Sequence, residues 1–131
     1  MRYILDTDIL IDLEKAKKEM LITINKLTGT LELADYNITF INLFEFLLGV
    51  KIKSHENQAK AKSFVEKFGV LNTSDRTASV LADLKTKYDR RVEVMSLADL
   101  IIASLAIEND MFLISRDSDF EEIEELKKII I

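Results

Sequence analysis

The sequence predicts an α/β fold, a three-layer α/β/α sandwich around a short central parallel sheet. Short apolar segments alternate with segments of helical periodicity, which is typical of parallel strands joined by helices. The strand candidates lack polar alternation, as expected when helices cover both faces of a sheet. With 131 residues, 48% of them apolar, the chain is expected to fold as a single domain, residues 1–131.

The individual elements follow from local patterns. Apolar, partly β-branched runs predict strands over 2–5, 37–41, 69–72, 111–115 and 128–131. Apolar residues at helical spacing predict helices over 8–15, 17–28, 42–50, 54–68, 74–90, 96–110 and 119–128. Asn42, Ser54 and Ser96 are the expected N-caps of three of these helices, and Gly29 is an expected helix end.

Composition narrows the functional class. A net charge of −5 argues against a protein that coats nucleic acid by bulk charge, so any nucleic-acid contact must be local. The absence of cysteine excludes disulfides, thiolate catalysis and cysteine-based zinc sites. No signal peptide and no apolar stretch of membrane-spanning length is recognisable, so the expected location is cytoplasmic, without membrane contact.

Acidic residues follow the predicted strands at matching places. Asp6 comes directly after the first strand, and Asp117 and Asp119 follow the strand at 111–115. Glu45 and Asp99 each lie three residues into a helix. Because the carboxyl ends of parallel strands share one edge, we expect these side chains to meet there.

Such a cluster needs neutralisation. Two like charges about 4 Å apart repel by about 4 kcal/mol at an effective dielectric constant of about 20. Oxygen-only ligands select hard ions, so Mg²⁺ or Mn²⁺ is the expected cofactor. A carboxylate-held ion of this kind promotes phosphodiester hydrolysis.

Four of these five acids also have a structural interpretation, whereas Asp6, directly after a buried strand, has no obvious capping role. Asn42-x-x-Glu45 and Ser96-x-x-Asp99 both have the spacing of a capping box. Asp117 and Asp119 have the character of turn residues.

Other polar residues near the acids are open to two interpretations. Asp8 is either the N-cap of the first helix or a metal ligand, and Asp12 is expected on the solvated surface. Arg116 lies inside the acidic loop, where it either holds a phosphate or offsets charge.

The apolar residues Ile11, Phe44, Leu47 and Leu48 are interpreted as an interface or as core.

Three stretches together resemble the PIN domain, and most closely the VapC-type toxins of toxin–antitoxin operons: "ILDTDILIDL", "FINLFEFLLG" and "SLADLIIASLAIENDMFLISRDSDF". The resemblance implies the α/β/α fold and a Mg²⁺- or Mn²⁺-dependent endoribonuclease that cleaves RNA. It also implies a cognate antitoxin that blocks the acidic site, and homodimers are common among such proteins. Residue 8 is often Asn or Ser in them, so Asp8 departs from the pattern.

The resemblance also implies roles for individual residues. Asp6, Asp99 and Asp117 correspond to metal ligands, Glu45 to a further acid of the site, and Asp119 to an auxiliary acid. Thr7 and Ser115 correspond to small hydroxyl residues beside the site, and Arg116 is a candidate phosphate contact.

Two other functions remain open from the sequence. One is a PIN-like interaction module without catalytic activity. The other is a phosphoacceptor receiver domain, which has acids after its first strand but would need Asp75 as acceptor and Lys127 or Lys128 near the last strand. That alternative leaves Glu45 and the Asp117–Asp119 pair unexplained.

Overall fold

A computed structural model describes residues 1–88 and 95–131. Its strands are β1 (Tyr3–Leu5), β2 (Tyr36–Thr39), β3 (Gly69–Leu71), β4 (Phe112–Ser115) and β5 (Lys128–Ile130). Its α-helices are α1 (Thr7–Glu14), α2 (Lys18–Thr28), α3 (Phe40–Val50), α4 (His55–Val65), α5 (Asp75–Tyr88) and α6 (Leu97–Glu108). Two short 3₁₀ helices, η1 (Leu33–Asp35) and η2 (Ser118–Glu122), complete the described elements.

The five strands form one parallel sheet in the order β3-β2-β1-β4-β5. Strand β1 is central, with β2 on one side and β4 on the other. The residues that follow β1 and β4 therefore emerge side by side at the carboxyl edge of the sheet, as the α/β prediction requires.

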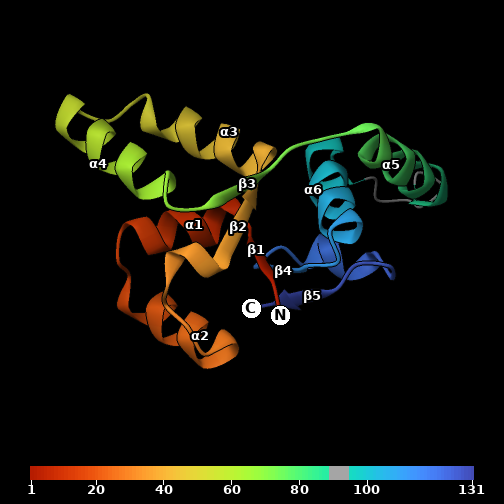
Figure 1. Cartoon of the computed structure of the whole chain (residues 1–131), viewed down its shortest axis with the longest axis horizontal. Helices are drawn as coiled ribbons and strands as arrows, with labels where there is room; N and C mark the ends of the chain where they lie inside the picture. Colours follow the sequence, from red (N-terminus) through yellow and green to blue (C-terminus); the bar gives the residue numbers. More distant parts are fainter. Residues whose placement is uncertain (89–94) are drawn as a thin grey trace.

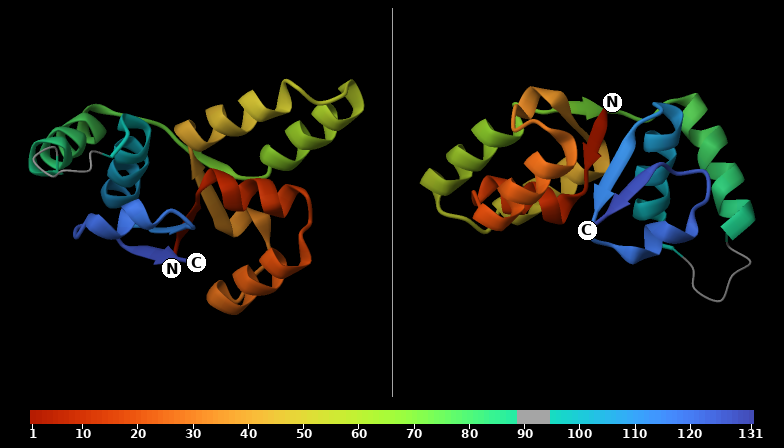
Figure 2. Two further views of the ribbon diagram at one scale, coloured as in Figure 1. Left: turned by 180° about the vertical axis from the view of Figure 1, so that it is seen from behind. Right: turned by 90° about the horizontal axis from the view of Figure 1, so that it is seen from below.

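Helices cover both faces of the sheet, which confirms the predicted three-layer fold. Figure 1 shows α1 to α4 on one side of the strands and α5 and α6 on the other, and the view from below in Figure 2 agrees. Tyr3 and Leu5 of β1 join the core with α1 to α4, whereas Ile4 joins the core with α5 and α6. Successive side chains of a strand point to opposite faces, so an unbroken apolar strand supplies both cores. Among the described residues, no helix is long and apolar enough to cross a bilayer.

The start of α3 differs from the prediction. Strand β2 ends at Thr39, and Thr39 rather than Asn42 is the N-cap. The Thr39 hydroxyl accepts from the Asn42 N–H, and the Asn42 side chain accepts from the Thr39 N–H, so the two form a capping box. Threonine suits both a strand and a cap, so the run 37–41 does not reveal where one ends and the other begins.

The helix predicted over 119–128 is wrong. Only the 3₁₀ helix η2 forms, and the chain then turns toward β5. Phe120, Ile123 and Leu126 are all buried, at a spacing of three residues. That spacing matches the 3.0 residues per turn of a 3₁₀ turn as well as it matches an α-helix. The predicted C-terminal end of the helix 74–90 lies outside the described residues, whereas Ser54, Ser96 and Gly29 act as the helix ends that were predicted.

Candidate metal centre

The predicted acids come together at the carboxyl edge of the sheet. Asp6 directly follows β1 and caps α1, and Asp117 is the second residue after β4 and caps η2. Asp99 lies in the first turn of α6. The charges of Asp117, Asp6 and Glu45 all act on Asp99, so four separate segments contribute to one site. We call Asp6, Glu45, Asp99, Asp117 and Asp119 the acid cluster.

Three members of the acid cluster lie close enough together to hold one ion. Asp99, Asp117 and Asp119 each offer a carboxylate oxygen, and these oxygens lie within 4.8 Å of one another. Opposite ligands of octahedral Mg²⁺ are about 4.2 Å apart, given Mg–O distances of about 2.1 Å. A small side-chain adjustment therefore brings the three oxygens into range, and an all-oxygen donor set fits Mg²⁺ or Mn²⁺.

Asp6, which the sequence predicted as a ligand, is held firmly beside this group. One carboxylate oxygen, Oδ1, accepts from the Thr7 N–H at 2.9 Å, and Oδ2 accepts from the Ser115 hydroxyl at 2.6 Å. The Ser115 hydroxyl in turn accepts from the Asp117 N–H at 2.9 Å. The small hydroxyl at 115 thus ties the end of β1 to the loop that carries Asp117.

Glu45 is fixed by the other predicted hydroxyl. The Thr7 hydroxyl donates to Glu45 Oε1 at 2.8 Å. The capping-box interpretation of Glu45 is therefore wrong, because the box is formed by Thr39 and Asn42. Asn42 itself donates from Nδ2 to Asp6 at 3.2 Å and to Thr7 Oγ1 at 3.1 Å. Sequence reasoning treated Asn42 only as a cap and missed these contacts.

The turn interpretation of Asp117 is realised, and of the capping box predicted at Ser96 and Asp99 the structure shows the half formed by the Ser96 side chain. Asp117 accepts from the Asp119 N–H at 2.9 Å, as a turn-forming aspartate does. Ser96 accepts from the Asp99 N–H at 3.1 Å and caps α6. Capping and turn formation thus place the backbone of these acids, and their carboxylates remain directed toward one another.

The cluster raises the pKa of its own members. Burial is the main cause of the raised pKa of Asp6, opposed by the hydrogen bonds from Ser115 and Thr7 and increased by the charges of Asp8 and Asp117. Burial and the neighbouring carboxylates raise the pKa of Asp99 to about 6, although a hydrogen bond with Ser96 opposes them. A cation would relieve this repulsion and favour the ionised forms.

Asp8 is not the cap of α1, because Asp6 takes that role. Asp8 lies exposed in the first turn, where its charge raises the pKa of Asp6. It adds negative charge near the cluster without a hydrogen bond to any of its members in the described part of the chain.

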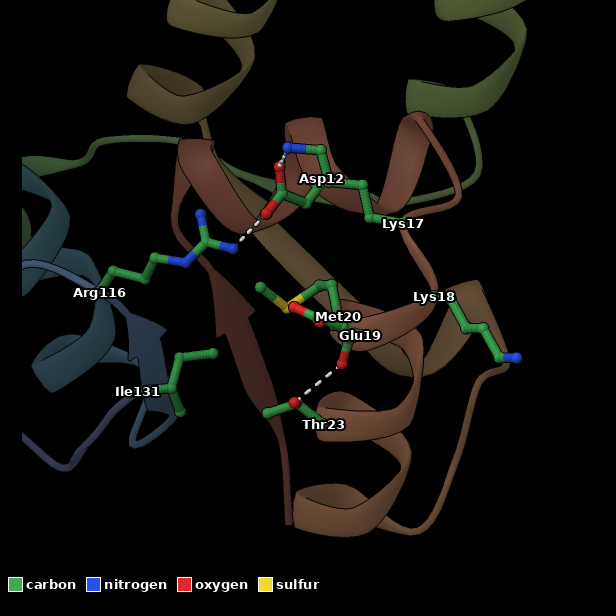
Figure 3. A pocket seen from close by; sticks show the side chains of 8 residues that line it. All are labelled: Asp12, Lys17, Lys18, Glu19, Met20, Thr23, Arg116 and Ile131. Atoms are coloured by element: carbon green, nitrogen blue, oxygen red, sulfur yellow. Dashed lines mark hydrogen bonds and ion pairs between the residues drawn. The ribbon is translucent and has the colours of Figure 1, made fainter.

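Asp12 is buried, so the prediction of a solvated side chain is wrong. Arg116 donates to Asp12 Oδ2, and Lys17 Nζ lies 3.1 Å from Oδ1. Figure 3 shows these three side chains, here called the salt-bridge cluster, at the edge of a pocket of about 530 Å³ that Met20 and Ile131 also line. Arg116 therefore offsets charge, as one alternative foresaw, but the charge is that of Asp12.

Burial alone would raise the pKa of Asp12. The hydrogen bonds and charges of Arg116 and Lys17 outweigh that effect and lower the pKa below its ordinary value. Asp12 thus remains ionised in the interior because two cations contact it.

Solved structures share this fold over nearly the full chain. A structure described as VapBC2 from Rickettsia felis bound to a promoter DNA fragment aligns with a TM-score of 0.83 and 23% identity, covering 100% of this chain and 99% of that one. DNA-bound VapBC from Salmonella typhimurium aligns with a TM-score of 0.82 and 20% identity, covering 99% and 98%. VapBC-1 from nontypeable Haemophilus influenzae aligns with a TM-score of 0.81 and 21% identity, covering 99% of this chain and 98% of that one.

The search among curated proteins gave no match. A family model, by contrast, matches residues 3–126, a span that includes every member of the acid cluster, and its description is "PIN domain". The chain therefore belongs to the PIN domain family.

Proposed function

We propose that this protein is a Mg²⁺- or Mn²⁺-dependent endoribonuclease and the toxin of a type II toxin–antitoxin pair. Membership of the PIN family, together with the similarity to VapBC structures, supports nuclease activity as the general class of function. The observation that carries the metal dependence is the set of three carboxylate oxygens within 4.8 Å, next to a fourth carboxylate with a raised pKa.

In this proposal Asp6, Asp99 and Asp117 hold the ion, with Asp119 as an auxiliary ligand. The bound ion would supply positive charge to the phosphodiester and make a water molecule more acidic. Glu45, fixed through Thr7, completes the site or orients the attacking water. Thr7 and Ser115 hold the carboxylates of Glu45 and Asp6 in place.

Arg116 has a modified role in this proposal. The sequence suggested a phosphate contact, but the guanidinium donates to buried Asp12. We therefore assign Arg116 a supporting role, in which it anchors the first residue after β4 and so the start of the loop that carries Asp117.

The proposal extends to protein partners. The similar structures named above are described as VapBC complexes, which supports a cognate antitoxin for this chain. A homodimer is supported by apolar side chains exposed on α3, since Phe44 and Leu48 are 56% and 61% exposed. Ile11 and Leu47 are half-buried, and Ile11 packs against the core. Light scattering of the purified chain, with Leu48→Glu as comparison, tests the homodimer.

The decisive experiment is cleavage of a labelled single-stranded RNA by the purified protein. We expect cleavage with Mg²⁺ or Mn²⁺, loss with EDTA and loss in Asp6→Asn. Asp83→Asn is the matched control, because Asp83 is an exposed acid on α5, an element that contributes no member to the acid cluster. Equal cleavage by all samples would reveal a contaminant, and a folded protein that binds Mn²⁺ without cleaving RNA would favour the interaction module. Parallel assays on DNA and double-stranded RNA test the choice of RNA.

A further inference from the structure

One buried polar side chain beside the acid cluster has two different sets of partners. Asn42 is 0% exposed and lies in the first turn of α3. Its carbonyl oxygen accepts from the Thr39 N–H at 3.0 Å and from the Thr39 hydroxyl at 2.7 Å. Its NH₂ group donates to Asp6 Oδ1 at 3.2 Å and to Thr7 Oγ1 at 3.1 Å. The NH₂ group thus donates to the two residues that directly follow β1.

Capping explains only the carbonyl half of this side chain. The residue at this position of a capping box needs to accept from the N-cap N–H, and a carboxylate does so as well as an amide. A carboxylate at position 42, however, would place a second negative oxygen about 3.2 Å from Asp6 Oδ1. The donor half of Asn42 therefore serves the contact with Asp6 rather than the helix.

The amide also sets the direction of the next hydrogen bond. A threonine hydroxyl has one proton, and since Thr7 Oγ1 accepts from Asn42, that proton is available for Glu45 Oε1 at 2.8 Å. Asn42 thus contacts one acid directly and orients a second acid through Thr7. Asp6 and Glu45 come from different elements of the fold, and Asn42 is where their supports meet.

We infer that Asn42 is a positioning residue of the acid cluster, which fixes Asp6 and Glu45 relative to each other for metal binding. This inference rests on the proposed metal site. Removing a hydrogen-bond partner that orients metal ligands typically weakens metal binding by about 10- to 100-fold.

The test separates the donor half of Asn42 from its capping half. Asn42→Asp has the same shape and keeps an acceptor for Thr39, but it loses both donors. Ser54→Ala is the matched control, because Ser54 also caps a helix, accepting from the Asn57 N–H at the start of α4, an element that contributes no member to the acid cluster. Mn²⁺ affinity of the folded proteins, measured by electron paramagnetic resonance, is the main measurement, with thermal unfolding and kcat and KM on RNA alongside.

We expect Asn42→Asp to weaken Mn²⁺ binding at least about tenfold and to lower kcat, at temperatures where it is folded. Ser54→Ala is expected to lower the melting temperature with unchanged Mn²⁺ affinity. If wild type binds Mn²⁺ and Asn42→Asp binds it equally well, the inference is wrong.

A second measurement keeps the inference testable even if the metal site is not there. Asn42→Asp should lower the melting temperature of the wild type more than it lowers that of Asp6→Asn, because an amide at position 6 can pair with a carboxylate at 42. Absence of Mn²⁺ binding by the wild type would refute the proposed function, and the double-mutant comparison would still decide whether Asn42 holds Asp6. Equal effects in both backgrounds would overturn that contact.

Discussion

The acid cluster and the salt-bridge cluster share two segments, α1 with its cap and the loop after β4, yet their carboxylates have opposite surroundings. Asp12 is buried against Arg116 and Lys17, and its pKa is lowered. Asp6 and Asp99 face other carboxylates, and their pKa values are raised. Within the described residues, the protein supplies its own cations to the salt-bridge cluster, whereas the acid cluster requires a cation or protons from solution.

The difference separates a carboxylate that is paired inside the chain from carboxylates that the proposed function assigns to metal binding. A carboxylate that contributes to stability is paired inside the chain, and pairing at Asp12 is complete. A carboxylate cluster whose members have raised pKa values costs stability when its members are ionised, and such clusters are common at functional sites. Four predictions test this comparison.

The largest effect is expected for a member of the acid cluster. Asp117→Asn removes one carboxylate of the proposed metal site and is expected to lower kcat/KM on RNA at least about 100-fold, or about 3 kcal/mol of transition-state stabilisation. Initial rates at saturating Mg²⁺ measure this. A loss smaller than about fivefold, with the Asp83→Asn control at wild-type activity, would show that Asp117 is not a ligand.

The second effect concerns stability. Asp12→Asn removes the charge that holds Arg116, and we expect the free energy of unfolding to fall by about 2 kcal/mol at pH 7. That value is below the 3–5 kcal/mol typical of broken buried pairs, because Arg116 can reach solvent. Urea unfolding gives the value. An unchanged midpoint would mean that Asp12 contributes no net stability through its cations.

The third prediction compares the two sites as pH changes. The folded pKa of Asp99, about 6, exceeds its usual 3.8, so ionised Asp99 destabilises the metal-free fold above pH 6 and this penalty vanishes toward pH 4. Asp99→Asn should therefore raise metal-free stability at pH 7. The full shift corresponds to about 3 kcal/mol, and solvent screening of this partly exposed group reduces the expected gain to about 1 kcal/mol.

The contribution of Asp12 to stability depends on pH with the opposite sign. Its lowered folded pKa adds stability that is present above about pH 4 and is lost as pH falls through the folded pKa. Unfolding curves of both variants from pH 3 to 8 check the pair of signs. A stability gain in Asp12→Asn, or a loss in Asp99→Asn, at neutral pH would reverse the comparison.

The smallest effect is expected at Lys17, whose side chain is 56% exposed. Lys17→Met should cost only about 0.5 kcal/mol, because an exposed partner contributes little and Arg116 remains. Thermal unfolding at low salt and at 1 M NaCl measures it, and the difference from wild type should shrink at high salt. A cost above about 1.5 kcal/mol would make Lys17, rather than Arg116, the main partner of Asp12.

The sequence predicted what depends on local pattern. Asp6 was placed correctly at the carboxyl end of β1 because a buried strand that ends in an acid is a local signal, and Ser96 was placed correctly as a cap for the same reason. The three-layer fold followed from the alternation of elements and is confirmed by the family model and the similar structures. The metal-ligand roles of the acids remain predictions.

What the sequence did not show depends on distant partners. Asp12 and Arg116 are 104 residues apart, so nothing in the pattern of α1 distinguishes a buried, paired aspartate from a solvated one. Asn42 was predicted as a cap because capping is local, and its contact with Asp6, 36 residues away, is not. The helix prediction over 119–128 failed for another reason, since apolar residues at intervals of three fit both a 3₁₀ helix and an α-helix.

The central position of β1 has a consequence for synthesis on the ribosome. Asp6 leaves the ribosome before its neighbour β4, the Ser115 hydroxyl and Asp117, which follow only after α1 to α6 have been made. Domains fold as the chain emerges, and contacts of high sequence separation form last. An incomplete nascent chain therefore carries Asp6 and Glu45 without the acids that complete the cluster. In a nuclease, that order of assembly would keep the site inactive beside the messenger RNA that is being translated.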